Sequence, residues 1–205
     1  MKRLFCLLLI FTTITLCGCT VAKTEEETTE TSLQTESISY TSRIIDESDY
    51  FTVINNGDFT YSYEIRDKSG NIILSDNSEK RTPHINMMDE NTVKLMIQRG
   101  TGISTQITFF VNVETGMVSE DFISVFDEYN GRIAYHLYQN SKHYMIVRDI
   151  FDKEAFYKEF EIDDDIYAVA DAVVSADFSQ DGKKLTVIYL AGEDYKETET
   201  VFFIE

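Results

Sequence analysis

Short runs of β-branched and aromatic residues, each closed by a turn, constrain this chain more than any other feature of its 205 residues. Such residues favour strands, whereas Gly, Asn and Asp favour the tight turns between them. The sequence therefore predicts an all-β domain. We expect strands over residues 51–54, 59–66, 71–74, 93–98, 106–113, 117–122, 132–139, 142–149, 185–190 and 198–203.

The residue patterns of three further segments do not settle their secondary structure. Residues 152–162 fit either a strand or a short helix, residues 165–174 fit a helical turn or an inner strand, and residues 37–45 can add one more strand. Several strands, such as 106–113, are apolar on both faces, which indicates burial between neighbouring sheets. Asn140-Ser141 can form a two-residue hairpin turn between the strands 132–139 and 142–149.

Two kinds of turn recur along the chain. One kind falls at residues 89–91, 128–131 and 180–182, and the other at 67–70, at 114–116 and near 153. The spacing of about 40–50 residues is the period of a four-stranded propeller blade.

Residues 176–187 resemble the WD-like repeats of bacterial periplasmic β-propellers, which read Phe-Ser-Pro-Asp-Gly-Lys-x-Leu, although Gln180 replaces the proline. The resemblance implies a propeller-like array of antiparallel blades. The strands group roughly as three, four, four and three, so the array is expected to be incomplete. A two-sheet β-sandwich is the alternative.

The amino end has the pattern of an export signal. Lys2 and Arg3 precede the uncharged run 4–16, which is about 20 Å long as a helix and too short to span a bilayer. Leu16-Cys17-Gly18-Cys19 follows and resembles the lipobox of bacterial lipoproteins. That resemblance implies cleavage after Gly18 and attachment of a diacylglycerol to Cys19, with fatty acids such as palmitate. We therefore expect residues 1–18 to be a signal peptide.

Residues 19–36 are rich in Thr, Glu and Ser and predict a disordered stalk, which leaves residues 37–205 as the folded domain. The whole chain carries 18 Lys and Arg against 36 Asp and Glu, a net charge of −18. Residues 41–205 alone carry 15 basic and 31 acidic side chains, so the acidity belongs to the domain. A surface this acidic repels phosphate backbones and argues against nucleic-acid binding.

Candidate chemical groups are few. No cysteine follows Cys19, which excludes disulfides and thiol nucleophiles from residues 20–205. The proposed hairpin turn would place His136 opposite Met145 and His143 opposite Tyr138, with both imidazoles on one face, but the sequence supplies no third metal ligand. His84 follows Pro83 in an expected loop. Asp163-Asp164-Asp165 lacks the register of a calcium loop, so we expect a solvated turn.

No catalytic motif, phosphate loop or dinucleotide fingerprint occurs in the sequence, so we expect no enzyme, no cofactor and no bound metal. Tyr61, Tyr63 and Tyr195 can either form a recognition surface or pack in strands. The expected function is that of a binding module, held by its lipid on the outer face of a cell membrane, with an unidentified protein or ligand as partner. The alternatives are a surface hydrolase, a Ca²⁺-dependent carbohydrate-acting domain, or an accessory subunit.

Overall fold

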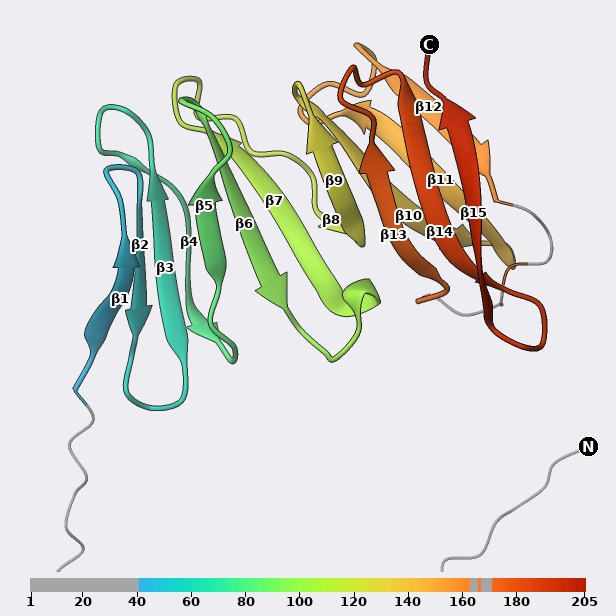
Figure 1. Ribbon diagram of the computed structural model, residues 1–205. Helices are drawn as coiled ribbons and strands as arrows, with labels where there is room; N and C mark the ends of the chain where they lie inside the picture. The colour runs from blue at the N-terminus through green and yellow to red at the C-terminus, as the bar shows by residue number, and fades with distance from the viewer. Residues whose placement is uncertain (1–40, 163–165, 167–170) are drawn as a thin grey trace, which may run out of the picture. The chain divides into compact units, whose positions relative to one another are not determined.

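The computed structural model describes residues 41–162, 166 and 171–205, and these residues fold almost entirely into antiparallel β-sheet (Figure 1). This described part contains fifteen strands in four sheets, and its only helix is a single 3-10 turn at Ile103–Thr105. It belongs to one compact unit, Ser39–Glu205. Among the described residues, no helix is long and apolar enough to cross a membrane. The all-β prediction is confirmed.

Each sheet is an up-and-down run of strands that follow one another in sequence. Sheet A contains β1 (Arg43–Glu47), β2 (Phe51–Asn55), β3 (Tyr61–Arg66) and β4 (Ile72–Glu79). Sheet B contains β5 (His84–Met87), β6 (Thr92–Gln98), β7 (Gln106–Asn112) and β8 (Phe122–Ile123). Sheet C contains β9 (Val125–Tyr129), β10 (Arg132–Gln139), β11 (Lys142–Asp149) and β12 (Tyr157–Glu161). Sheet D contains β13 (Val173–Phe178), β14 (Lys184–Ala191) and β15 (Lys196–Phe203).

The two recurring kinds of turn occupy equivalent places in successive sheets. Residues 89–91, 130–131 and 179–182 each join the first and second strands of a sheet, namely of sheets B, C and D. The turns after Arg66, Asn112 and Asp149 each join the third and fourth strands, in sheets A, B and C. The sequence periodicity therefore marks a repeated meander.

Neighbouring sheets pack face to face through three hydrophobic cores. Sheets A and B share a core that includes Phe51, Val53, Tyr63, Ile65, Ile85, Val93, Leu95 and Val111. Sheets B and C share a smaller one that contains Phe110, Phe122, Val125 and Ile133. Sheets C and D share a core that includes Ala134, Met145, Val147, Val173, Ala176, Leu185 and Val187. Figure 1 shows sheet A beside sheet B, and sheet D in front of sheet C.

Strand β7 illustrates why the middle sheets are apolar on both faces. Phe110 and Val111 are adjacent in sequence and therefore point to opposite faces, and both are fully buried. Val111 packs in the core that sheet B shares with sheet A. Phe110 packs in the core that sheet B shares with sheet C, where the centroids of its ring and the Phe122 ring lie 6.0 Å apart. The prediction that residues 106–113 lie between two sheets is confirmed.

Polar contacts also join neighbouring sheets. Lys94 of β6 forms a half-buried ion pair with Glu128 of β9. The Asp127 carboxylate accepts a hydrogen bond from the backbone N–H of Phe178 at 2.7 Å, which fixes β9 against β13. Within the described residues, the four sheets close neither into a barrel nor into a ring.

Three local predictions need correction. Of residues 117–122, only Phe122 belongs to a strand, because the Ser119 hydroxyl accepts the hydrogen bond of the Phe110 N–H and interrupts regular pairing. His84 begins β5 rather than lying in a loop, and an edge strand tolerates the preceding proline, which has no N–H to pair. Strand β9 has no counterpart among the predicted strands.

The structure settles part of the secondary structure of the three segments whose patterns were ambiguous. Residues 157–161 form strand β12, and Arg43–Glu47 forms β1 at the end of the segment 37–45. Of residues 165–174, residues 165 and 167–170 lie outside the described residues, and Val173 and Val174 begin β13.

Candidate functional site

A β-bulge in strand β1 turns an acidic side chain toward the neighbouring sheet. Ile44 pairs with Ile54 and Asp46 pairs with Val53, so Ile45 is the extra residue of the bulge. Val53 is buried in the core between sheets A and B. Because paired residues share a face, the bulge places Asp46 on the side of sheet A that faces sheet B.

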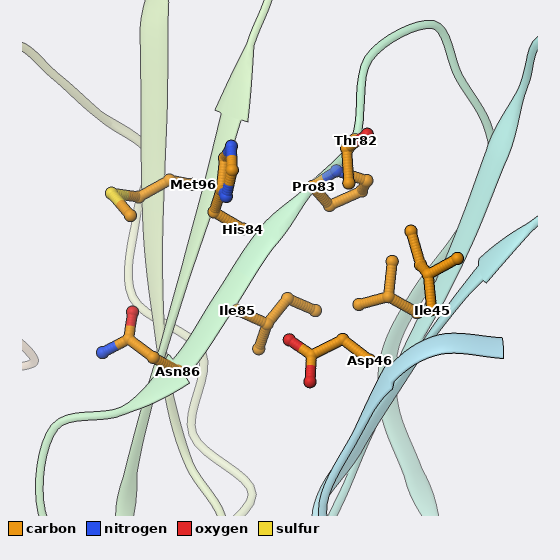
Figure 2. Close-up of a pocket in the computed structure, with 9 residues that line it drawn as sticks. Ile45, Asp46, Thr82, Pro83, His84, Ile85, Asn86 and Met96 are labelled. Carbon is orange, nitrogen blue, oxygen red and sulfur yellow. The ribbon is translucent and has the colours of Figure 1, made fainter.

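Asp46 borders a groove between the first strands of these two sheets. The groove has a volume of about 400 Å³, within the range of small-molecule sites. Its apolar wall contains Ile45, Val53, Pro83 and Ile85, and Thr82 adds a hydroxyl. Figure 2 shows Ile45 and Asp46 of β1 opposite Ile85 of β5. The groove therefore offers one carboxylate against an apolar wall.

His84 also borders this groove, together with Asn86 and Met96. Alternate residues of a strand point to opposite faces, so the side chains of His84 and Asn86 leave β5 on the side away from Ile85. Figure 2 shows these two side chains and Met96 on that other side of the strand. His84 is consequently not aimed at Asp46, and the two do not form an acid–base pair.

The second candidate group is the histidine pair of the β10–β11 hairpin. Asn140 and Ser141 have φ values of 54° and 62°, which make a tight two-residue turn. His136 pairs with Met145 and His143 with Tyr138, as predicted from the sequence. The turn therefore brings both imidazoles to one face, a diagonal step apart.

The two imidazoles are hydrogen-bonded to each other. His136 Nε2 lies 2.9 Å from His143 Nδ1, and the ring planes are inclined by 11° with centroids 5.1 Å apart. One of these nitrogens must donate and the other accept, so the contact needs at least one neutral ring. His136 and His143 are only 6% and 2% exposed.

Burial lowers the pKa of His143, because the charged ring would lose its hydration. No described group hydrogen-bonds its Nε2 atom. The described residues bring no group of three or more His, Cys, Asp or Glu side chains into metal-binding range. His136 and His143 form a buried, hydrogen-bonded pair in which at least one ring is neutral.

The other residues singled out from the sequence have varied positions. Cys19 and Asp163-Asp164-Asp165 lie outside the described residues. Tyr63 packs in the core between sheets A and B, where burial raises its pKa to about 12, so it belongs to no recognition surface. Tyr61 is half-buried, and Tyr195 is exposed in the β14–β15 turn.

Asp46 was not among the residues predicted from the sequence. Simple alternation along 43–47 would put Asp46 on the same face as Ile44, and nothing in these five residues marks a bulge. No protein-family model matches the sequence, and a search of curated proteins finds no relative.

Proposed function

We propose that this chain is a lipid-anchored extracytoplasmic lipoprotein whose β domain binds a ligand in the groove between β1 and β5. The anchor is supported by the uncharged run 4–16 followed by Leu16-Cys17-Gly18-Cys19. Two acyl chains on Cys19 would hold the protein on a membrane without help from a basic surface. The binding role rests on one observation, which is the bulge that turns Asp46 toward the groove.

The lining of the groove favours a ligand with an apolar body and a positively charged amine. Ile45, Val53, Pro83 and Ile85 offer apolar contact, and burial of a ligand against them contributes about 25 cal/mol per Å². Among the described residues that line the groove, Asp46 supplies the one carboxylate. A domain with net charge −16 over residues 41–205 also attracts cations in general.

We further propose that the four sheets are the blades of an open, propeller-like array. The proposal is supported by the repeated meander, by the equivalent turns and by the approach of first strands, such as β9 and β13, in neighbouring sheets. In such an array, the first strands of adjacent blades border a common space. The groove between β1 and β5 would then lie at that inner edge.

Methyl-group NMR of the chain from residue 20 onward tests the binding site. The probe is 2-phenylethylamine, and its uncharged analogue 2-phenylethanol is the matched control. We expect the amine to shift the methyl signals of Ile45 and Ile85 and to leave those of Ile133 and Ile204 unchanged, because these two lie in other cores.

Asp46→Asn should weaken binding of the amine about two- to fivefold, as expected for a solvent-accessible ion pair. Glu193→Gln makes the same charge change in the β14–β15 turn and should have no effect. Equal binding of the amine and the alcohol, or shifts that avoid Ile45 and Ile85, would show that the groove is not a site of this kind.

A further inference from the structure

Strand β15 differs from every other edge strand in the described part of the chain. The other edge strands, β1, β4, β5, β8, β9, β12 and β13, are at most six residues long or carry a register shift. Short strands and bulges are the devices by which proteins prevent unwanted pairing at sheet edges. Strand β15 is eight residues long and pairs with β14 without any shift.

The side of β15 that faces away from β14 carries backbone groups that no described strand pairs with. Ile204 N donates to Lys183 O at 2.9 Å, which makes Lys183 and Ile204 a hydrogen-bonded pair. Antiparallel pairs alternate between bonded and non-bonded, so the N–H and C=O groups of residues 197, 199, 201 and 203 point away from β14. No described strand pairs with that edge, and sheet D has three described strands where sheets A, B and C have four.

The side chains of the same four residues give this edge its chemistry. Glu197, Glu199, Val201 and Phe203 are all exposed, on the face of sheet D opposite its core with sheet C. Val201 is 40% and Phe203 is 67% exposed. Lys184 is the one basic residue that pairs with this row, and its Nζ lies 5.3 Å from the centre of the Phe203 ring.

We propose that β15 is a docking edge for an extended, basic segment of a partner protein, which adds a fourth strand to sheet D. Backbone hydrogen bonds to the outward groups would supply affinity, as in other cases of strand addition. Lys or Arg at alternate positions of the partner would pair with Glu197 and Glu199, and its apolar residues would cover Val201 and Phe203.

The negative charge of the domain favours a basic partner segment over a second copy of the chain at this edge. Residues 41–205 carry a net charge of −16, so two copies repel each other at any shared edge. A basic segment is attracted by the same charge. This edge belongs to sheet D and the groove belongs to sheets A and B. The proposal of a docking edge therefore does not depend on the proposed ligand site.

The test uses the full chain in a mild non-ionic detergent and an eight-residue peptide of alternating Lys and Val, blocked at both ends. Isothermal titration should show saturable binding of one peptide per chain. Two control peptides should fail to bind: one with Glu in place of Lys, and one N-methylated at alternate residues, which keeps the charge but cannot complete the strand ladder.

Two protein variants locate the contact. Val201→Pro removes an outward N–H without removing a bond to β14, and it should abolish binding. The pair Glu197→Gln and Glu199→Gln should weaken binding about three- to tenfold, the range expected for two exposed ion pairs, while Glu193→Gln should leave it unchanged. Amide exchange at Glu199 and Val201 should slow when the peptide binds.

The N-methylated peptide keeps the test decisive if Val201→Pro fails to fold. Several outcomes would overturn the proposal: no saturable binding, equal binding of the N-methylated or acidic peptide, or amide protection elsewhere in the chain. Concentration-dependent self-association that protects the β15 amides would also overturn it, because the occupant would then be a second copy.

Discussion

His143 is a buried imidazole whose charge state is coupled to folding. Its pKa is lowered by burial, so the folded protein binds this proton less tightly than the unfolded chain, where the pKa is about 6.5. The stabilising contribution of the neutral ring is therefore complete above about pH 6.5 and is lost as the pH falls through the folded-state pKa. Protonation of both rings would also break the contact between His136 and His143.

We expect the midpoint of thermal unfolding to fall between pH 7.5 and pH 5.5. In His143→Leu the same pH change should lower the midpoint less, because the variant has lost the imidazole whose pKa is lowered by burial. The variant shares every carboxylate with the wild type, so the difference between the two curves isolates the histidine. A variant whose midpoint falls as steeply as that of the wild type would contradict the argument.

Gly182 is held by both its backbone and a neighbouring ring. Its φ is +68°, and a Cβ atom there would lie 2.2 Å from a carbon of the Tyr129 ring. Gly131 has a similar φ of +76° with no atom near the same position, so it separates the two effects. Gly131→Ala should cost about 1–2 kcal/mol of unfolding free energy for the left-handed backbone alone.

Gly182→Ala should cost that amount and about 1–3 kcal/mol more, because the new methyl group must displace the ring. Urea denaturation of the two variants measures the difference. Equal losses would mean that the ring of Tyr129 moves away from the turn at no cost.

At the scale of elements, the turn between β10 and β11 is not optimal. Asn140 and Ser141 both have a positive φ, of 54° and 62°. Asparagine tolerates this backbone conformation well, whereas serine does not. Ser141→Gly should stabilise the protein by about 0.5–1 kcal/mol, since the relief of backbone strain exceeds the greater entropy of glycine in the unfolded chain.

Ser175→Gly in the middle of β13 is the matched control and should destabilise the protein by about 0.5–1 kcal/mol. Both values can be measured by urea denaturation. A loss of stability in Ser141→Gly would mean that the serine side chain makes a contact that outweighs its backbone strain.

The elements differ in how well they could be predicted. Strands β10 and β11 begin and end at the predicted residues, because both are long and the turn between them is fixed by Asn140 and Ser141. Strands β5 (His84–Met87) and β9 (Val125–Tyr129) were missed because they are short. The partners of β9 include Lys94 and the backbone of Phe178, which no local pattern reveals.

The candidate sites also differ in how well they could be predicted from the sequence. The histidine pair could be predicted because it depends only on a turn and on strand alternation. The groove could not, because it depends on the bulge at Ile45 and on how sheets A and B pack. The long regular edge of β15 was visible only in part, as the strand 198–203, because its edge position depends on the order of strands in sheet D.

At the scale of the whole molecule, the excess of acidic residues sets the response to ions. Several described acids are held in turns, where Asp67 accepts hydrogen bonds from Asn71 Nδ2, Asn71 N and Ser69 N, and Asp181 accepts them from Ser179 Oγ and Lys183 N. These bonds lower the pKa of both carboxyls. Such carboxylates serve their own turns and lie far apart along the chain.

We therefore expect monovalent salt to raise the unfolding midpoint modestly, because it screens the repulsion among acidic side chains. Millimolar Ca²⁺ should add nothing at matched ionic strength. A rise of several degrees that is specific to Ca²⁺ would contradict this prediction, because a ligand bound only by the folded state stabilises it. That result would point to a calcium site and would favour the Ca²⁺-dependent alternative.

The proposed function requires that the β domain be carried on a membrane by a lipid at Cys19. Metabolic labelling with radioactive palmitate, in a bacterial host that processes lipoproteins, tests that claim directly. The wild-type chain should take up the label and sediment with membranes after loss of residues 1–18. Cys19→Ser should remain uncleaved and unlabelled, whereas Cys17→Ser should behave like the wild type. Equal labelling of Cys19→Ser and the wild type, or no labelling of either, would contradict the account.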